Sequence, residues 1–484
     1  MNKPLDLEHV VKSGATEAMD AAVQVSPLRK LLLNRADRQL TEHFIENNPE
    51  RMPLRVQNMR KRAIMNLLYS IERGIRRGLV GPGVRKQVLS SFIGNVLTGE
   101  KERMRPFRER YGFDPPTFIT ISPTKRCNLQ CTGCYAGSTA ADARTLDYEV
   151  FTRILNEKRE EWGSHFTVIS GGEPLMYESR GKSLLDVVGE HKDNYFLMYT
   201  NATLITDEVA ARMAELGNIT PAISVEGWEA ETDERRGKGV FARVLQAMGH
   251  LRRHGVPFGI SVTATKHNAE TVLSDELMNY FFDEQGAIFG WIFQYMPIGR
   301  SYTVDLMVTP EQRTWMLERE MKLIYEHDRF MVDFWNGGPL SLGCIAAGRS
   351  GGYFYLDWDG NISPCVFFPY AIDNVHAMYE RGNTISDVLF TDYFEKIRSW
   401  QDDYRGHDGE SEVKNLFCPC PIRDHHAFAE RLITEHDVVP LDPDAQAAYG
   451  DEEYHSRMRD YDARLAELLG PLWQEKMETE EAEQ

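Results

Sequence analysis

The stretch Ser122-Pro-Thr-Lys-Arg-Cys127-Asn-Leu-Gln-Cys131-Thr-Gly-Cys134-Tyr-Ala136 holds three cysteines in C-x3-C-x2-C spacing. It directly follows an apolar run that predicts a strand, so the cysteines are expected in the loop at that strand's carboxyl end. A closed iron–sulfur cluster or structural zinc site normally takes four thiolates. Three close cysteines therefore predict a cluster with one iron open to a further ligand, and an incomplete zinc site is the alternative at this point.

The chain from Pro115 onward alternates short β-branched and aromatic runs with longer amphipathic stretches. The expected strands are 117–122, 166–170, 195–200, 221–225, 258–263 and 290–295, and the expected helices lie near 147–162, 207–216, 240–254, 270–284 and 310–328. This order predicts a repeated βα array and an α/β fold. In a parallel barrel of this kind the active site lies at the carboxyl ends of the strands.

A second motif, Ser170-Gly-Gly-Glu-Pro174, ends the second expected strand. Its two adjacent glycines allow close approach of the backbone to a ligand, and Glu173 presents a carboxylate beside them. With C-x3-C-x2-C after the first strand and Gly-Gly-Glu-Pro after the second, the sequence resembles the radical S-adenosylmethionine superfamily. The resemblance implies a partial (β/α)6 TIM-like barrel with a helical N-terminal region and a small cysteine-rich C-terminal extension.

The same resemblance implies a chemistry. Cys127, Cys131 and Cys134 would hold a [4Fe–4S] cluster, and the amino and carboxylate groups of S-adenosylmethionine would chelate its open iron. One electron would then cleave the cofactor to a 5′-deoxyadenosyl radical that abstracts hydrogen from an unactivated carbon. A low-potential donor such as flavodoxin or ferredoxin would supply the electron.

The resemblance also assigns a cofactor surround, in which the glycine motif receives the methionyl amino group. The residues assigned to it are Gly171, Gly172, Glu173, Pro174, Ser224, Glu226, Tyr135 and Met296. One position departs from the family pattern, which usually has an aromatic residue immediately before the third cysteine. This chain has Gly133 there and Tyr135 on the other side of Cys134. Tyr135 is therefore either a contact of the cofactor or a side chain packed inside the barrel.

Four further cysteines lie in a loop-rich region after residue 330. Cys344 and Cys365 fit C-x15-G-x4-C, and Cys418 and Cys420 follow in C-x-C spacing. Four cysteines in two pairs close either a zinc site or a second cluster. The pattern resembles the single-cluster "twitch" form of the SPASM extension, which implies a second [4Fe–4S] cluster. Asp359-Gly360 predicts a hairpin turn between strands at 353–357 and 363–368.

The composition is that of a soluble globular protein, with 484 residues, 42% hydrophobic residues and a net charge of -18. The charge argues against a nucleic-acid partner, and neither a membrane span nor a signal core is apparent, so a cytoplasmic location is expected. Residues 51–110 are basic and carry Val56, Met59 and Ala63 at helical spacing. They predict either a helix that contacts a membrane surface or substrate, or a helical cap whose basic face is solvated.

Four parts are expected along the chain: a helical basic region (1–110), the barrel (111–330), the auxiliary-cluster extension (331–440) and an acidic helical tail (441–484). The substrate is not specified, and a peptide or protein, a small molecule, a lipid and a tetrapyrrole all stay open. The alternative function is a non-enzymatic iron–sulfur carrier or electron-transfer protein, which would not need the Gly-Gly-Glu-Pro motif. Asp424-His425-His426 are either a proton donor or ligand group, or surface and helix-capping residues.

Overall fold

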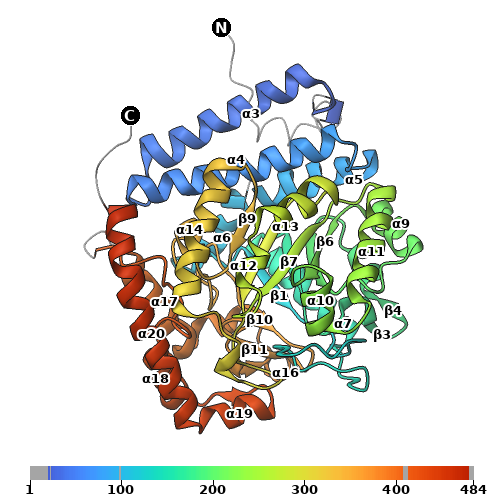
Figure 1. The fold of residues 1–484 in the computed structure, drawn as a ribbon. Coiled ribbons are helices and arrows are strands. Elements are labelled where there is room, and N and C mark those ends of the chain that lie inside the picture. Colours follow the sequence, from blue (N-terminus) through green and yellow to red (C-terminus); the bar gives the residue numbers. More distant parts are fainter. Residues whose placement is uncertain (1–19, 22, 98–99, 407–411, 479–484) are drawn as a thin grey trace.

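Six parallel strands form the centre of the molecule in the computed structural model, which describes residues 20–21, 23–97, 100–406 and 412–478 (Figure 1). They pair in chain order with parallel register. The strands are β1 (Phe118–Ile121), β2 (Phe166–Ile169), β5 (Tyr195–Thr200), β6 (Ile219–Val225), β7 (Gly259–Ala264) and β8 (Gly290–Gln294). The expected α/β class and six-strand β/α repeat are confirmed, in an open sheet.

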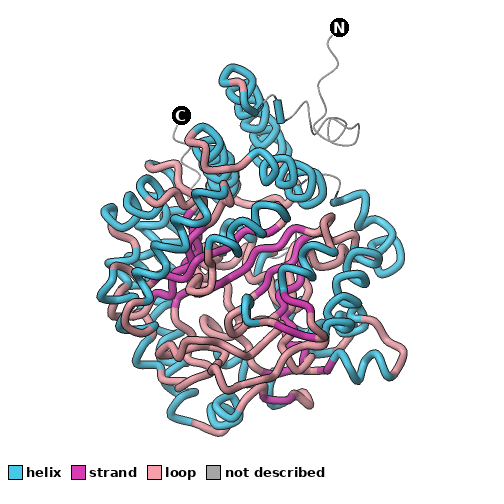
Figure 2. The backbone as a smooth tube through the Cα atoms, turned by 90° about the vertical axis from the view of Figure 1, so that its right-hand side faces the viewer, coloured by secondary structure: helices cyan, strands magenta, loops and turns pink. Residues whose placement is uncertain are grey.

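Helices connect these strands and surround the sheet in Figure 2. They are α7 (Tyr148–Trp162), α8 (Leu184–Glu190), α9 (Asp207–Leu216), α10 (Glu229–Arg236), α11 (Val240–His254), α12 (Ala269–Val272) and α13 (Asp275–Asn279). In α7 the Asp147 side chain caps the first turn by accepting from Glu149 N, and Gly163 in the left-handed region (φ 65°) ends the helix. The apolar face of α7 buries Phe151 and Trp162 against the sheet.

The central sheet continues beyond the barrel strands at both edges. On one side β9 (Met331–Asp333) pairs with β8. On the other, β10 (Tyr355–Leu356) pairs in parallel with β1, and β11 (Asn361–Ser363) and β13 (Asp373–Asn374) follow in antiparallel register. The Asp-Gly turn therefore does join a hairpin, with shorter strands than expected. The sheet runs without a break across residue 330, where the sequence predicts a domain boundary.

The N-terminal region is helical, as expected. It consists of α3 (Ser26–Thr41), η1 (Glu42–Asn47), α4 (Leu54–Arg76), α5 (Pro82–Gln87), η2 (Val88–Leu97) and α6 (Glu100–Tyr111). Figure 1 shows α3 and α4 side by side across one end of the molecule. The apolar stripe of α4 is buried at Val56, Met59 and Ala63, where it packs on α14 (Pro310–Glu326) and α15 (Gly338–Ser341). This stripe is used for packing inside the molecule.

The C-terminal part wraps beside the sheet as α16 (Val375–Glu380), α17 (Asp392–Arg405), α18 (His426–Glu435), α19 (Pro443–Tyr449) and α20 (Glu452–Trp473). A second apolar core joins α4, α14 and α20 through side chains such as Met59, Leu317 and Leu469. The acidic end of the expected tail, residues 479–484, lies outside the described residues. Within the described part, no helix is long and apolar enough to span a membrane.

Candidate functional site

The first three cysteines lie in the loop after β1 and line one cavity of about 370 Å³. All are free thiols, and burial raises the pKa of Cys127 to about 12. Three groups aim hydrogen-bond donors at these sulfurs: Leu129 N and Asn201 Nδ2 lie 3.5 and 3.8 Å from Cys127 Sγ, and Arg236 Nη1 lies 4.0 Å from Cys131 Sγ. Amide donors and a cation around converging thiols suit a cluster of thiolates.

The two glycines of the second motif bring its loop against the cysteine loop. Gly172 N donates to Thr124 O (2.9 Å), and Glu173 N donates to Arg126 O (2.9 Å). A Cβ on Gly172 would lie 2.3 Å from Arg126 O, so only glycine fits this approach. The glycines thus allow close packing of backbone on backbone, in addition to lining the cavity.

Glu173 lies behind the cavity wall and is fully buried. Its Oε1 accepts from Thr200 Oγ1 (2.7 Å) and Leu175 N (3.2 Å), and its Oε2 accepts from Asn201 N (2.9 Å). Burial raises the pKa of this carboxyl, and the three donors oppose the shift. Glu173 therefore connects the motif to the end of β5 by hydrogen bonds. The buried Pro174 begins the short 3-10 turn that follows.

Two arginines in the cavity wall were not predicted as site residues. Arg235 and Arg236 line the cavity, and both pair with Oε1 of the buried Glu226, at 2.5 Å from Arg235 Nη1 and 2.7 Å from Arg236 Nε. Glu226 Oε2 accepts from Thr263 N (3.0 Å). Glu226 thus holds the arginines in place from behind. The signal in the sequence is the Arg-Arg pair nine and ten positions after the acidic residue.

Position 133 is a glycine because the side chain of Tyr295, the residue that follows β8, lies directly against it. A Cβ on Gly133 would lie 2.5 Å from Cε2 of Tyr295, and Gly133 has φ 63°. The ring of Tyr295 therefore occupies the space that a side chain at position 133 would need. Tyr135 instead hydrogen-bonds to the second motif, donating to Ser170 Oγ (2.9 Å) and accepting from Gly171 N (2.9 Å). Both tyrosines line the cavity, as do Ser224 and Met296.

The four cysteines of the second group do not all lie in one place: three line a cavity, and one is packed in an apolar core. Cys344, Cys365 and Cys420 line a second cavity of about 320 Å³. Cys418 lies instead in the second apolar core, among side chains such as Phe417 and Leu469. Burial raises the pKa of all four thiols, that of Cys365 to about 12. The structure therefore brings together three of the four thiols that the sequence suggested as one ligand set.

A buried ion pair holds the loop that carries Cys418 and Cys420. Arg313 and Asp424 are both fully buried at their side chains and pair through both guanidinium nitrogens. Asp424 Oδ2 also accepts from Cys420 N (3.1 Å), and Arg313 Nη2 donates to Phe417 O (3.0 Å). Asp424 is thus a structural residue of the cysteine loop. His425 is half-buried with its Nε2 3.0 Å from Cys418 O, and His426 is buried, so His426 is not a surface residue.

The two cavities adjoin, because they share a wall of mainly aromatic side chains. The shared residues are Trp291, Met296, Phe334, Ile345, Tyr353 and Phe367. The first and the second cysteine group therefore line neighbouring cavities on either side of one apolar wall. A molecule held in either cavity beside this wall contacts groups that exclude water.

Comparison with known proteins identifies the family. Residues 121–275 match the family model of the radical SAM superfamily. The chain is 30% identical over 292 residues to the mycofactocin maturase MftC of Mycolicibacterium smegmatis, covering 58% of this chain and 70% of that protein. It is 24% identical over 350 residues to an AdoMet-dependent heme synthase of Methanosarcina barkeri, covering 66% of this chain and 95% of that protein.

Solved structures share the fold. The protein anSMEcpe, with bound AdoMet and a peptide, aligns with a TM-score of 0.50 at 17% identity, covering 74% of this chain and 100% of that chain. SuiB of Streptococcus suis, bound to its precursor peptide SuiA, aligns with a TM-score of 0.50 at 19% identity over 61% and 70% of the two chains. Together with the matched family model and the maturase, the cysteine loop and the glycine motif show that this chain belongs to the radical SAM superfamily, whose enzymes use a [4Fe–4S] cluster and S-adenosylmethionine.

Proposed function

We propose that this enzyme removes a hydrogen atom from an unactivated C–H bond of a substrate held between its two cysteine groups. Cys127, Cys131 and Cys134 would hold the cluster, and S-adenosylmethionine would occupy the adjoining cavity. When bound, this pair supplies a 5′-deoxyadenosyl radical by one-electron cleavage of the sulfonium. The observation that carries the proposal is the convergence of the three thiols, the glycine motif and two arginines on one cavity.

The polar groups at the carboxyl ends of the strands would bind the amino-acid part of the cofactor. Gly171 and Gly172 expose backbone there, and Ser224 and Thr200 add hydroxyl groups. Arg236 would balance the negative charge of the thiolates, since its guanidinium lies 4.0 Å from Cys131 Sγ and is itself anchored by Glu226. Glu173, Pro174 and Glu226 act as positioning residues, because all three lie behind the wall.

The apolar depth of the cavity would protect a reactive species from water. Its walls are lined by Phe118, Phe166, Leu197, Trp291 and Phe293 from four strands. These apolar side chains keep water away from the reacting groups, which limits side reactions. The apolar lining of the cavity also favours a substrate whose reacting carbon belongs to an apolar group. A peptide side chain meets this requirement, as does a small apolar molecule.

The second cysteine group would hold a second [4Fe–4S] cluster through Cys344, Cys365 and Cys420. Cys365 Sγ lies 3.1 Å from Tyr353 Oη and 3.4 Å from Phe367 N, so two donors meet this sulfur. Such donors tune a cluster's potential. A cluster here would exchange electrons with the substrate or with a flavodoxin- or ferredoxin-like donor. Zinc is the competing occupant, and the metal content of the purified protein distinguishes them.

The decisive experiment measures cleavage of S-adenosylmethionine by the anaerobically reconstituted, reduced protein. Wild type should form 5′-deoxyadenosine, and Cys127→Ala should lose at least about 100-fold of this activity, because a cluster ligand is gone. Cys365→Ala is the matched control, since it removes a thiol of the other group and should retain the cleavage. A wild type without cleavage would favour the iron–sulfur carrier, and full activity in Cys127→Ala would refute the ligand assignment.

A further inference from the structure

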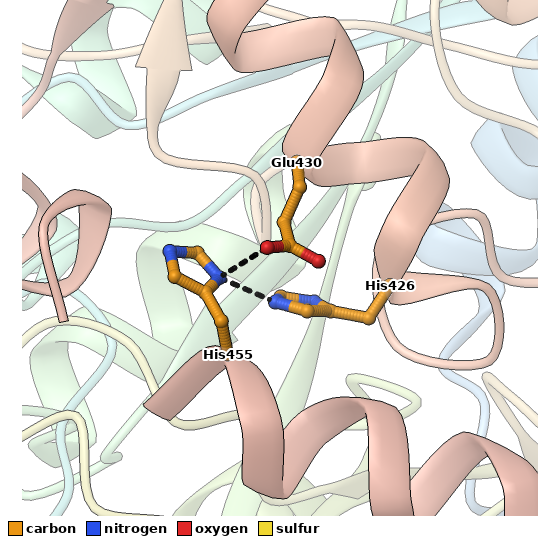
Figure 3. A group of neighbouring side chains, drawn as sticks. All are labelled: His426, Glu430 and His455. Carbon is orange, nitrogen blue, oxygen red and sulfur yellow. Dashed lines mark hydrogen bonds and ion pairs between the residues drawn. The ribbon is translucent and has the colours of Figure 1, made fainter. Parts of the chain in front are cut away.

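Two buried histidines face each other where α18 meets α20 (Figure 3). His426 Nε2 and His455 Nδ1 are 2.8 Å apart, and the residues are 3% and 7% exposed. Each histidine also points its other nitrogen at a backbone carbonyl. His426 Nδ1 lies 2.9 Å from Ile422 O, and His455 Nε2 lies 3.2 Å from Tyr449 O.

The carbonyl partners favour one arrangement of the protons on the two imidazole rings. A carbonyl oxygen only accepts, so His426 Nδ1 and His455 Nε2 each carry a hydrogen. A neutral imidazole has a single N–H, so the two nitrogens that face each other both present lone pairs. Lone pairs at 2.8 Å repel one another. With both histidines donating to carbonyls, a cation between the rings, either one shared proton or a metal ion, satisfies both lone pairs.

Glu430 supplies a third donor from the same face of α18, four residues after His426. Its Oε1 lies 3.7 Å from His455 Nδ1, and ligand atoms of the three residues lie within 4.8 Å of one another. Arg459 pairs with both Glu430 (2.7 Å) and Glu452 (2.5 Å). Of these two carboxylates, that of Glu430 lies beside His455 and supplies the negative charge that favours a cation there.

We infer that His426, His455 and Glu430 bind a divalent transition metal of the zinc class. Two imidazoles and one carboxylate are a common ligand set for zinc, with water as the fourth ligand. A cavity of about 20 Å³ beside both histidines has room for one such water. Histidines that bind metal typically donate their other N–H to a carbonyl or carboxylate, as both do here.

The ion would fasten the end of the cysteine loop to the C-terminal helix. His426 begins α18 two residues after Asp424, the residue that holds Cys420 N. His426 N also donates to Asp462 Oδ2 (2.5 Å) on α20. The metal therefore has a structural role that is separate from the radical chemistry and does not depend on the proposed function.

The first test uses the unmodified full-length protein with its clusters reconstituted and zinc supplied at micromolar concentration. X-ray absorption at the zinc edge reports only the ligands of zinc, so the iron of the clusters does not interfere with the measurement. We expect one zinc per chain with nitrogen and oxygen ligands at about 2.0–2.1 Å and imidazole scattering beyond them. A zinc shell of sulfur at about 2.3 Å, or no zinc retained after dialysis, would overturn the inference and leave a shared proton.

The second test uses variants with a matched control. Glu430→Gln and His455→Gln should weaken zinc binding by at least about 10-fold and 100-fold, whereas the iron content should stay unchanged in Glu430→Gln. His436→Gln is the control, because this histidine also lies at α18, bonds a carbonyl and pairs with Asp392 outside the site. Equal zinc binding in all three variants would refute the site. Since Glu430 is partly exposed, its variant is expected to fold.

Discussion

Cys418 and Cys420 are neighbours in sequence, but their side chains enter different surroundings. Cys420 faces the second cavity with Cys344 and Cys365, and Cys418 faces the apolar core. We predict that Cys420→Ala lowers the iron content from about eight to about four atoms per chain, because a cluster ligand is lost. Cys418→Ala should keep about eight. Iron analysis and electron paramagnetic resonance of the reduced proteins check both variants. Equal loss in both would indicate four-thiolate ligation.

Single residues also mark the limit of what the sequence predicts. The three cysteines and the glycine motif were found because each motif is contiguous in the chain. The contact between Gly133 and Tyr295 was not found, because it joins residues 162 positions apart through the pairing of distant strands. Likewise, the C-x-C spacing does not show that Cys420 lines a cavity and Cys418 lies in an apolar core, or that a buried Arg313–Asp424 pair holds their loop. The residue roles in the cofactor surround stay predictions.

At the scale of elements, the βα order was predicted well, and the strand pairing beyond it was not. Observed β1, β2, β5 and β8 each lie within one or two residues of their expected bounds. The pairing of β10 with β1 was missed, because it depends on an uncovered barrel edge rather than on local sequence. This pairing joins the expected barrel and extension in one sheet, and the four-part division stays a prediction.

The β10–β11 hairpin carries a titrating group that gives a testable pH dependence. Asp357 Oδ1 accepts from Asp359 N and Asn361 N (both 2.9 Å), and burial raises the pKa of Asp357 to about 6. Between about pH 4 and pH 6 the folded chain therefore keeps a proton that the unfolded chain releases, so this contribution to stability is lost as the pH rises. It amounts to at most about 3 kcal/mol.

The comparison of Tm between wild type and Asp357→Asn across this pH range isolates the effect. The Tm of the wild type should fall relative to that of the variant as the pH rises from 4 to 6. Above pH 6 the Tm difference between the two proteins should stay constant. Asp359→Asn is the control, since Asp359 lies in the same turn and is more exposed. A constant difference over the whole range would contradict the assignment to Asp357.

At the scale of the molecule, the sheet and the two adjoining cavities form one arrangement. The hairpin of the extension continues the barrel sheet from β1, and α4 contributes Arg60, Ala63 and Ile64 to the second cavity. Regions that are far apart in the sequence thus build two neighbouring apolar cavities. The N-terminal helices belong to this arrangement through α4, whose Asn66 Nδ2 donates to Ile324 O (2.8 Å) of α14.

The two long N-terminal helices differ in how firmly they are held, which predicts a gradient of hydrogen exchange. α4 has eight buried residues, and α3 has none. Because buried apolar contacts supply most of a helix's stability in a protein, α3 should open without α4. We expect backbone amides of α3 to exchange at least about 10-fold faster than those of α4, as measured by mass spectrometry of the 484-residue protein.

Arg29→Ala removes the 3.0 Å ion pair between α3 and Glu72 of α4. This variant should increase the exchange rate of the α3 amides further and leave that of the α4 amides unchanged. The capped helix α7 serves as a slow reference. Equal exchange in α3 and α4 would show instead that both helices unfold together with the sheet.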